Sequence, residues 1–116
     1  MNLKILGIFL IFIFSCGTKY KTKVIEKWGN GKNKIVHLYS DTYDSTNYLM
    51  ATYYDNGQLE VKGKLKNKIR EGFWQWWYKN GNKKEEATYS NGYFKGIKKH
   101  WNEDGKLCYR LHFPKD

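Results

Sequence analysis

The sequence predicts an all-β fold, in which tandem β-hairpin repeats form one elongated, twisted antiparallel meander sheet preceded by a signal peptide. Three turn dipeptides recur at 24-residue intervals: Asn56-Gly57, Asn80-Gly81 and Asp104-Gly105. Apolar residues alternate with polar ones on both sides of each turn, as they do in half-buried strands. No segment has the apolar spacing and capping residues of a helix. Such a period indicates hairpins that bury their apolar faces by stacking on their neighbours.

The amino terminus reads as a bacterial signal peptide over residues 1–15. Lys4 is the basic region, and an apolar run from Ile5 to Phe14 follows it. The run is too short to cross a bilayer core of ~30 Å, which needs about 20 residues. The stretch from Ile13 to Cys16 resembles a lipobox, whose cysteine is acylated and becomes the first mature residue. We therefore expect an exported protein, lipid-anchored through Cys16 to the periplasmic or extracellular side of the envelope; an ordinary signal-peptide cleavage nearby is the alternative.

The cysteines and the charge restrict the class of partner. Cys16 and Cys108 are the only cysteines, so a lipidated Cys16 leaves Cys108 without an intramolecular disulfide partner. The formal net charge of +10 would attract anionic lipid headgroups, acidic polysaccharide or acidic proteins. Nucleic acid is not expected as a partner, because an exported, lipid-anchored protein seldom meets it. Lysines that solubilise a sheet and protect its edges are the simplest explanation of the charge.

The turns divide the chain into segments. Residues 16–23 are predicted to be a lipidated tether, and residues 24–47 a degenerate first repeat with the turn Trp28-Gly29-Asn30-Gly31. The interval from Gly31 to Gly57 exceeds the period by two residues, and the segment from Asp41 to Asn47 is predicted to hold them as a loop. The regular array covers residues 48–113, and residues 114–116 are a tail.

The strand pattern predicts the length of each turn. Odd-numbered residues are mostly apolar on both sides of each turn, and they share one face only if the loop has three residues. The loop Asp55-Asn56-Gly57 would pair Tyr53 with Leu59 and Ala51 with Val61. Its glycine, like Gly81 and Gly105, would then adopt a left-handed conformation. The odd-numbered face is the predicted core, and it includes Phe73, Trp77 and Trp101.

The region from Tyr48 to Phe113 resembles tandem MORN-type repeats of the bacterial variant class. Three strings carry the resemblance: YYDNGQLEVKGKLKN, GFWQWWYKNGNKKEEATYSNG and GIKKHWNEDGKLCYRLHF. Lys98 replaces a usual aromatic residue, and Asn102 stands where Tyr54 and Tyr78 stand, so the last copy is predicted to be a capping unit. The resemblance implies a β-hairpin scaffold for interactions. Similar proteins include the antitoxin, or immunity partner, of a toxin, and others associate with membranes or form dimers, so an edge-to-edge homodimer is one option.

The sequence contains no arrangement typical of an active site, so we predict a protein that is not an enzyme and has no cofactor. Glu85 and Glu86 are adjacent in a strand and must point to opposite faces. Asp41 and Asp44 lie in a predicted loop, where they would form turns. The three histidines and Cys108 lack metal-ligand spacing, and no metal site is predicted. His100 and His112 are predicted on the even-numbered, polar face.

Aromatic residues on the even-numbered face are the candidate binding site. The predicted register places Trp76 opposite Lys84 and Trp74 opposite Glu86. A cross-strand ladder with lysine stems over the rings is the structural interpretation, and it is favoured for Trp74. For Trp76 and Tyr78 a partner-binding patch is an equal alternative, because Trp and Tyr dominate interface hot spots. The candidate partner-binding residues are Met50, Tyr54, Trp74, Trp76, Tyr78 and Lys84.

The predicted function is a non-enzymatic envelope lipoprotein whose repeats bind a protein. That protein would be a toxin if the chain is an antitoxin or immunity protein, and an acidic toxin encoded next to it would favour this role. A module that binds carbohydrate or anionic lipid headgroups is the alternative, in which aromatic rings stack on the ligand and lysines hold anions. Retention on envelope polysaccharide would favour that alternative.

Overall fold

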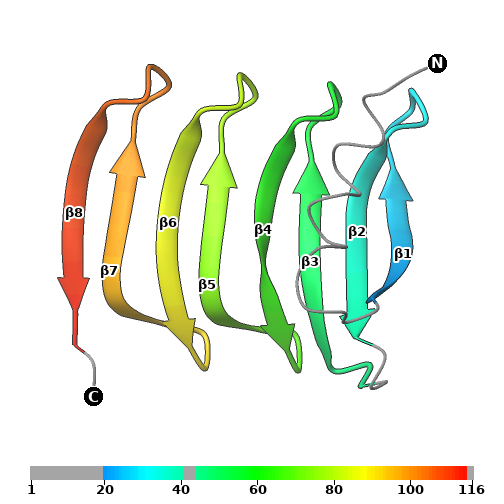
Figure 1. Cartoon of the computed structure of the whole chain (residues 1–116), viewed down its shortest axis with the longest axis horizontal. Coiled ribbons are helices and arrows are strands. Elements are labelled where there is room, and N and C mark those ends of the chain that lie inside the picture. The colour runs from blue at the N-terminus through cyan, green and yellow to red at the C-terminus, as the bar shows by residue number, and fades with distance from the viewer. Residues whose placement is uncertain (1–19, 41–43, 115–116) are drawn as a thin grey trace.

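The computed structural model describes residues 20–40 and 44–114, and these form one antiparallel sheet of eight strands. Neighbouring strands in the sheet are consecutive in the chain (Figure 1). The strands are Tyr20–Lys27 (β1), Asn33–Ser40 (β2), Asn47–Tyr53 (β3), Leu59–Lys66 (β4), Ile69–Trp77 (β5), Lys83–Ser90 (β6), Tyr93–Trp101 (β7) and Leu107–Phe113 (β8). The predicted all-β meander is confirmed.

The signal peptide, the lipobox with Cys16 and the loop residue Asp41 lie outside the described residues. β1 begins at Tyr20, so the last four residues of the predicted tether are part of a strand. Asp44 forms a turn, as predicted: its carboxylate accepts a hydrogen bond from the backbone N–H of Thr46 at 2.9 Å and another from the side chain of Asn47. In the described part of the chain, no helix is long and apolar enough to span a membrane.

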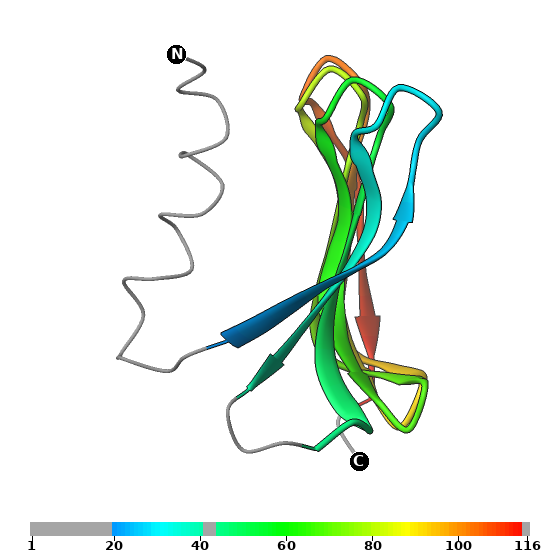
Figure 2. The same cartoon turned by 90° about the vertical axis from the view of Figure 1, so that its right-hand side faces the viewer.

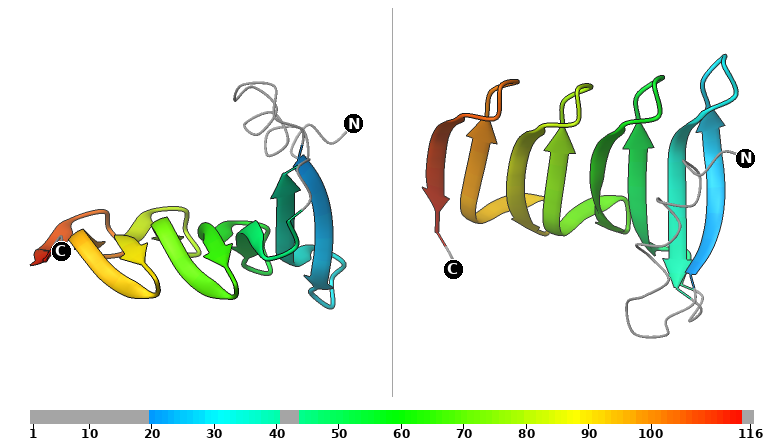
Figure 3. Two further views of the ribbon diagram at one scale, coloured as in Figure 1. Left: turned by 90° about the horizontal axis from the view of Figure 1, so that it is seen from below. Right: turned by 45° about the horizontal axis from the view of Figure 1, so that its top comes forward.

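The sheet is open and one layer thick (Figure 2). β1 and β8 are its two edges. Figure 3 shows β1 and β2 turned out of the plane of the later strands, as expected for a twisted sheet. Because nothing in the described chain forms a second layer, both faces of the sheet carry side chains that are at least partly accessible.

Four three-residue turns lie along one end of the sheet. In the second of them, Tyr54 N–H donates to Gln58 O at 2.8 Å, and Gly57 N–H donates to Tyr54 O at 2.9 Å. The other three turns make the same two bonds, including the turn that begins at Trp28. The third loop residue has a positive φ in each turn: Gly31 (81°), Gly57 (85°), Gly81 (92°) and Gly105 (90°). The predicted loop length, and the left-handed glycine that it requires, are confirmed.

Two-residue turns connect the hairpins at the opposite end. Asn67 and Lys68 have φ values of 50° and 65°, and Asn91 and Gly92 have values of 49° and 85°. Two consecutive positive φ angles define the type I′ turn, whose twist matches that of the flanking strands. Each repeat therefore uses one turn of each kind, which keeps the 24-residue period.

A β-bulge after each three-residue turn shows that the predicted register was wrong beyond the first pair. Tyr53 pairs with Leu59 as predicted, but Ala51 pairs with Lys62 rather than Val61. The cause is one extra residue on the second strand of each hairpin: Lys34 in β2, Glu60 in β4, Lys84 in β6 and Cys108 in β8. In the first hairpin, an extra residue on β1, Ile25, offsets Lys34. A bulge of one residue exchanges the faces of all the residues that follow it in the strand.

The core consequently lies on a face that mixes even and odd numbers, which we name the Trp74 face. Its middle row, paired strand by strand, is Thr52, Val61, Trp76, Glu85, His100 and Tyr109. The opposite face, which we name the Phe73 face, has the row Ala51, Lys62, Gln75, Glu86, Lys99 and Arg110. Each row passes from even to odd numbers at a bulge, so no single parity marks a face.

The buried residues correct the prediction of an odd-numbered core. On the Trp74 face, Trp74 and Ala87 are fully buried and Tyr89 nearly so. Phe73, predicted to be buried, is 53% exposed on the opposite face, and Trp77 and Trp101 are only partly buried. A second buried group lies on the Phe73 face near the N-terminal edge, and it consists of Val36, Leu38 and Ala51.

Side chains of successive turns form a hydrogen-bonded ladder that holds neighbouring hairpins together. The amide of Asn56 donates to Lys79 O at 3.1 Å, and the amide of Asn80 donates to Glu103 O at 3.0 Å. Beside them, the hydroxyl groups of Tyr54 and Tyr78 donate to carbonyl oxygens of the next hairpin, at 2.9 Å and 2.8 Å. The first turn makes corresponding bonds through Trp28 and Asn30.

The fourth turn ends the ladder. Asn102 replaces the tyrosine, and its side-chain oxygen accepts hydrogen bonds from Asp104 N–H at 3.1 Å and Lys106 N–H at 2.9 Å, both within its own turn. This turn accepts hydrogen bonds from the preceding hairpin and donates none to a following one within the described residues. That is the arrangement expected of the capping unit inferred from Asn102.

Replacing Asn80 with alanine should lower the free energy of unfolding by about 1 kcal/mol, since the side chain bonds both Glu103 O and Asn82 N–H. Asp104→Ala is the matched control, because the carboxylate of Asp104 makes no hydrogen bond to the described residues. Urea denaturation followed by tryptophan fluorescence measures both variants. Equal losses would show that the ladder contributes nothing specific to stability.

Candidate functional site

The aromatic cluster of the Trp74 face is built around one indole. Trp74 is fully buried, with 0% exposure, and its Nε1–H donates to Lys64 O at 3.1 Å. The ring lies against Gly63, where a Cβ atom would be 2.0 Å from Cδ2 of the indole. Partly buried apolar side chains surround the cluster: Met50, Val61, Leu65 and Trp76.

Arg70 covers this cluster. Its guanidinium carbon lies 4.9 Å from the ring centroid of Trp74, 5.4 Å from that of Trp76 and 5.3 Å from that of Tyr89. Its Nη1 also donates to the hydroxyl of Tyr89 at 3.1 Å. A cation over several rings supplies the cover that a second layer would supply in a thicker domain. Arg70 could not be assigned to this cluster from the sequence, because only its pairing with Leu65 places it on this face.

The predicted partners of the two tryptophans were wrong. Trp76 lies opposite Glu85, not Lys84, and Trp74 lies opposite Ala87, not Glu86. The bulge at Lys84 causes both errors. Lys84 itself lies with its ammonium 5.4 Å from the ring of Tyr78, so the predicted contact between a lysine and an aromatic ring exists, but with a different ring.

The structure divides the six predicted partner-binding residues into two groups. Met50, Trp74 and Trp76 belong to the cluster beneath Arg70. Tyr54, Tyr78 and Lys84 lie at the three-residue turns, where the two hydroxyl groups are part of the ladder. The first group packs the sheet. In the second group, the two tyrosines connect neighbouring hairpins, and Lys84 lies over the ring of Tyr78. All six have a structural role in the described chain.

The ladder tyrosines are held in the protonated form. Burial raises the pKa of the Tyr54 hydroxyl, and the negative charge of Glu60 adds to the increase. Loss of solvent likewise raises the pKa of Tyr78, with a further contribution from Glu103. Because the usual tyrosine pKa is already about 10, both hydroxyl groups remain hydrogen-bond donors at neutral pH.

Charged residues on the two faces form separate groups. Glu85 lies 3.1 Å from Lys98 and 3.6 Å from Nδ1 of His100, whereas Glu86 pairs with Lys83 at 2.6 Å. The pairing register puts Glu85 on the Trp74 face and Glu86 on the Phe73 face, which confirms that they point in opposite directions.

The two C-terminal histidines do not share a face, contrary to the prediction. His100 pairs with Tyr109 and stacks on its ring, with the centroids 5.0 Å apart. His112 pairs with Ile97, on the opposite face. The bulge at Cys108 separates them. Among residues 20–40 and 44–114, no group of three or more His, Cys, Asp or Glu side chains is arranged to hold a metal ion.

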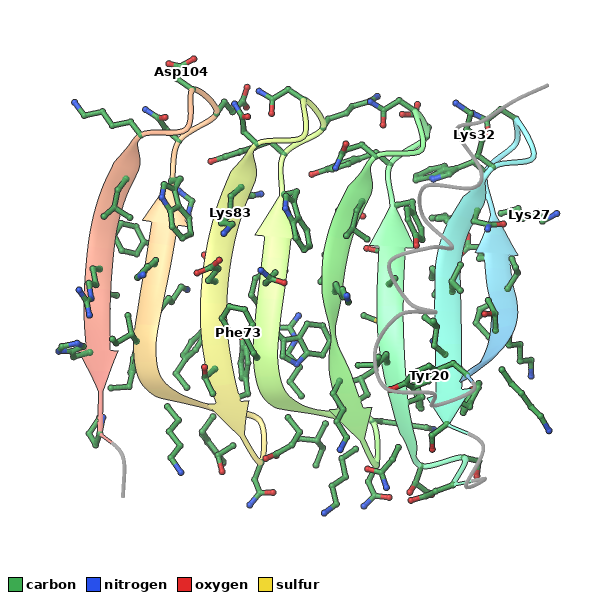
Figure 4. All side chains as sticks on the ribbon, in the orientation of Figure 1. Tyr20, Lys27, Lys32, Phe73, Lys83 and Asp104 are labelled. Carbon is green, nitrogen blue, oxygen red and sulfur yellow. The ribbon has the colours of Figure 1, made fainter. Side chains whose placement is uncertain are left out.

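A shallow groove lies on the Phe73 face over β5, β6 and β7. Phe73, at the middle of the sheet in Figure 4, is 53% exposed, and Ile97 is 36% exposed. Lys95 and Lys99 line the groove. Lys99 lies opposite Glu86 in the register, but neither lysine forms an ion pair with a carboxylate among the described residues. The full lining is Phe73, Glu86, Thr88, Lys95, Gly96, Ile97 and Lys99. We name this feature the Phe73 groove. It could not be found from the sequence, because the odd-numbered pattern assigned Phe73 to the core.

Comparison with known protein families identifies the repeat unit. Residues 49–67 and 70–91 match the MORN repeat variant family. The two central hairpins are similar to MORN-type repeats. Each match covers one strand, a three-residue turn and the next strand, so the MORN unit corresponds to β3 with β4 and to β5 with β6. Searches of curated proteins and of solved structures found no match.

MORN repeats indicate a repeat-based interaction module. In this chain the central MORN units supply Trp74, Trp76 and Phe73, and the groove extends onto β7, beyond the matched segments. On the Phe73 face, accessible apolar side chains lie beside cations that form no ion pair among the described residues. The aromatic side chains of the Trp74 face are used largely for packing.

Proposed function

We propose that this chain is a non-enzymatic interaction scaffold of the cell envelope, lipid-anchored through Cys16, whose MORN-type sheet binds an acidic protein. The Phe73 groove supports this proposal most directly. It exposes a phenylalanine and an isoleucine beside two lysines that form no ion pair with a carboxylate in the described chain. An apolar floor with a charged rim is typical of protein-binding surfaces.

The charge of the groove selects the class of partner. Lys95 and Lys99 would pair with acidic side chains and direct the association, while Phe73 would provide the apolar contact. A toxin with an acidic surface meets these requirements, so an antitoxin or immunity role is a specific form of the proposal. In that role the sheet would neutralise the toxin by covering its active surface.

A photo-cross-linking experiment in cells tests the proposed site. A benzophenone amino acid at position 73 should capture one acidic protein, and Lys95→Glu with Lys99→Glu should abolish the capture. Tyr93 is the control position, because it is 78% exposed but lies outside the groove lining. Adducts with polysaccharide or anionic lipid in place of protein would support the alternative function, and equal capture from both positions would contradict a specific site.

The lipid anchor has its own test. Cys16→Ser should abolish incorporation of labelled fatty acid and move the protein from the membrane fraction to the soluble fraction. Cys108→Ser is the matched control, since Cys108 is an exposed free thiol on β8 and should be dispensable for labelling. A parent protein that incorporates no lipid, with fractionation unchanged by Cys16→Ser, would contradict the anchor.

A further inference from the structure

The two edges of the sheet differ in their protection against pairing with another strand. β1 carries three lysines, and its pairing with β2 has two register shifts between Val24 and Lys27. Lysines and bulges both discourage a further strand from adding to an edge. β8 has no lysine and a single register shift, at Cys108 near its start, and it exposes Leu107 (47%), Tyr109 (41%) and Leu111 (46%). The C-terminal edge is therefore the less protected one.

The Phe73 face of this edge carries two cations that form no ion pair among the described residues. Arg110 pairs across the strands with Lys99, and neither forms an ion pair with a carboxylate in the described chain. Glu86, one strand further in, lies 2.6 Å from the ammonium of Lys83. A strand placed beside β8 would bring its own side chains next to Arg110, and acidic ones would be favoured there.

The Trp74 face of the same edge is apolar and aromatic. Tyr109 stacks on His100, and Phe113 stacks on Phe94 with the ring centroids 5.0 Å apart. Leu111 lies between Tyr109 and Phe113 on β8 and is 46% exposed. Apolar side chains of an added strand would cover Leu111 and the edges of both rings.

We propose that β8 pairs with an extended segment of another protein in which acidic and apolar residues alternate. Backbone hydrogen bonds to the open edge would give affinity, and the alternation would give specificity. A second copy of this chain does not meet the requirement, because β8 contains no carboxylate and β1 has one glutamate against three lysines. The edge is a different surface from the Phe73 groove, so the two proposals can fail separately.

Fluorescence anisotropy with labelled synthetic peptides tests the proposal on the full chain in detergent. The probe is a capped seven-residue peptide that alternates glutamate and valine, and the comparison peptide has lysine in place of glutamate. We expect the acidic peptide to bind at least tenfold more tightly, and Arg110→Glu to reverse that preference. A preference unchanged by Arg110→Glu would overturn the proposal.

Lysine substitutions at the two edges provide a matched comparison. Leu111→Lys should weaken binding of the acidic peptide at least tenfold, whereas Val24→Lys, at a residue with 42% exposure on β1, should not. Phe73→Ala should retain binding, and circular dichroism checks that each variant is folded. Loss of binding in Phe73→Ala but not in Leu111→Lys would assign the peptide to the groove and overturn the edge proposal. Dimerisation of the parent chain that Leu111→Lys abolishes would also overturn it.

Discussion

Trp74→Ala should lower the free energy of unfolding by about 3 to 5 kcal/mol, the usual cost of removing a fully buried large aromatic side chain. The indole fills the space between the backbone at Gly63 and the guanidinium of Arg70. Its loss would leave a cavity that a single-layer sheet cannot close, and would leave Lys64 O without its 3.1 Å hydrogen bond. Chemical denaturation measured by circular dichroism gives the stability difference.

Trp77→Ala is the control, because Trp77 is only partly buried and follows Trp76 on the opposite face. We expect Trp77→Ala to lower the free energy of unfolding clearly less than Trp74→Ala does. An odd-numbered core would require the reverse ranking. Trp76→Ala should fall between them, since Trp76 packs against the cluster at a ring distance of 6.0 Å from Trp74. A larger loss from Trp77→Ala would contradict the bulged register.

Gly63→Ala should be destabilising by about 1 to 3 kcal/mol, the cost of overpacking a well-filled core. The added Cβ would lie 2.0 Å from Cδ2 and 2.3 Å from Cε2 of the Trp74 ring. The ring cannot move aside easily, because Arg70 covers it and Ala87 is its cross-strand neighbour. Gly29→Ala is the control: its Cβ would meet nothing within 4 Å, and we expect little change.

A double-mutant cycle separates the clash from a backbone effect. Once Trp74 is alanine, a methyl group at position 63 has space, so Gly63→Ala should cost close to nothing in the Trp74→Ala background. The coupling free energy between the two sites would then equal most of the loss of stability caused by Gly63→Ala alone. Additive losses would show instead that glycine is needed at position 63 for its backbone alone.

The order of the strands and the geometry of the turns could be predicted because they depend on local chemistry. A glycine after Asn or Asp at a constant interval indicates a turn with a left-handed residue. Gly57, Gly81 and Gly105 have that conformation. Even the irregular turn at Gly31 was recognisable from Trp28-Gly29-Asn30-Gly31 alone. Short connections between strands then allow little besides a meander.

The faces of the sheet could not be predicted because a bulge has no local signal in this chain. Glu60, Lys84 and Cys108 share no chemistry, yet each is the extra residue of its hairpin. The bulge recurs with the repeat and leaves the 24-residue period unchanged, so the period could not reveal it. One unpaired residue after each turn moved Phe73 to the exposed face and Trp74 to the core.

The candidate site was predicted only in part for the same reason. Composition identified the tryptophans and lysines as the informative residues, but their neighbours depend on which residues pair across strands. Arg70 reaches three rings, and Lys99 lies beside Arg110, only in the assembled sheet. Backbone conformation at a turn is determined by the few residues within it, whereas the face of a side chain is determined by the pairing of whole strands. The tertiary structure therefore decided which aromatic residues are buried and which remain available to a partner.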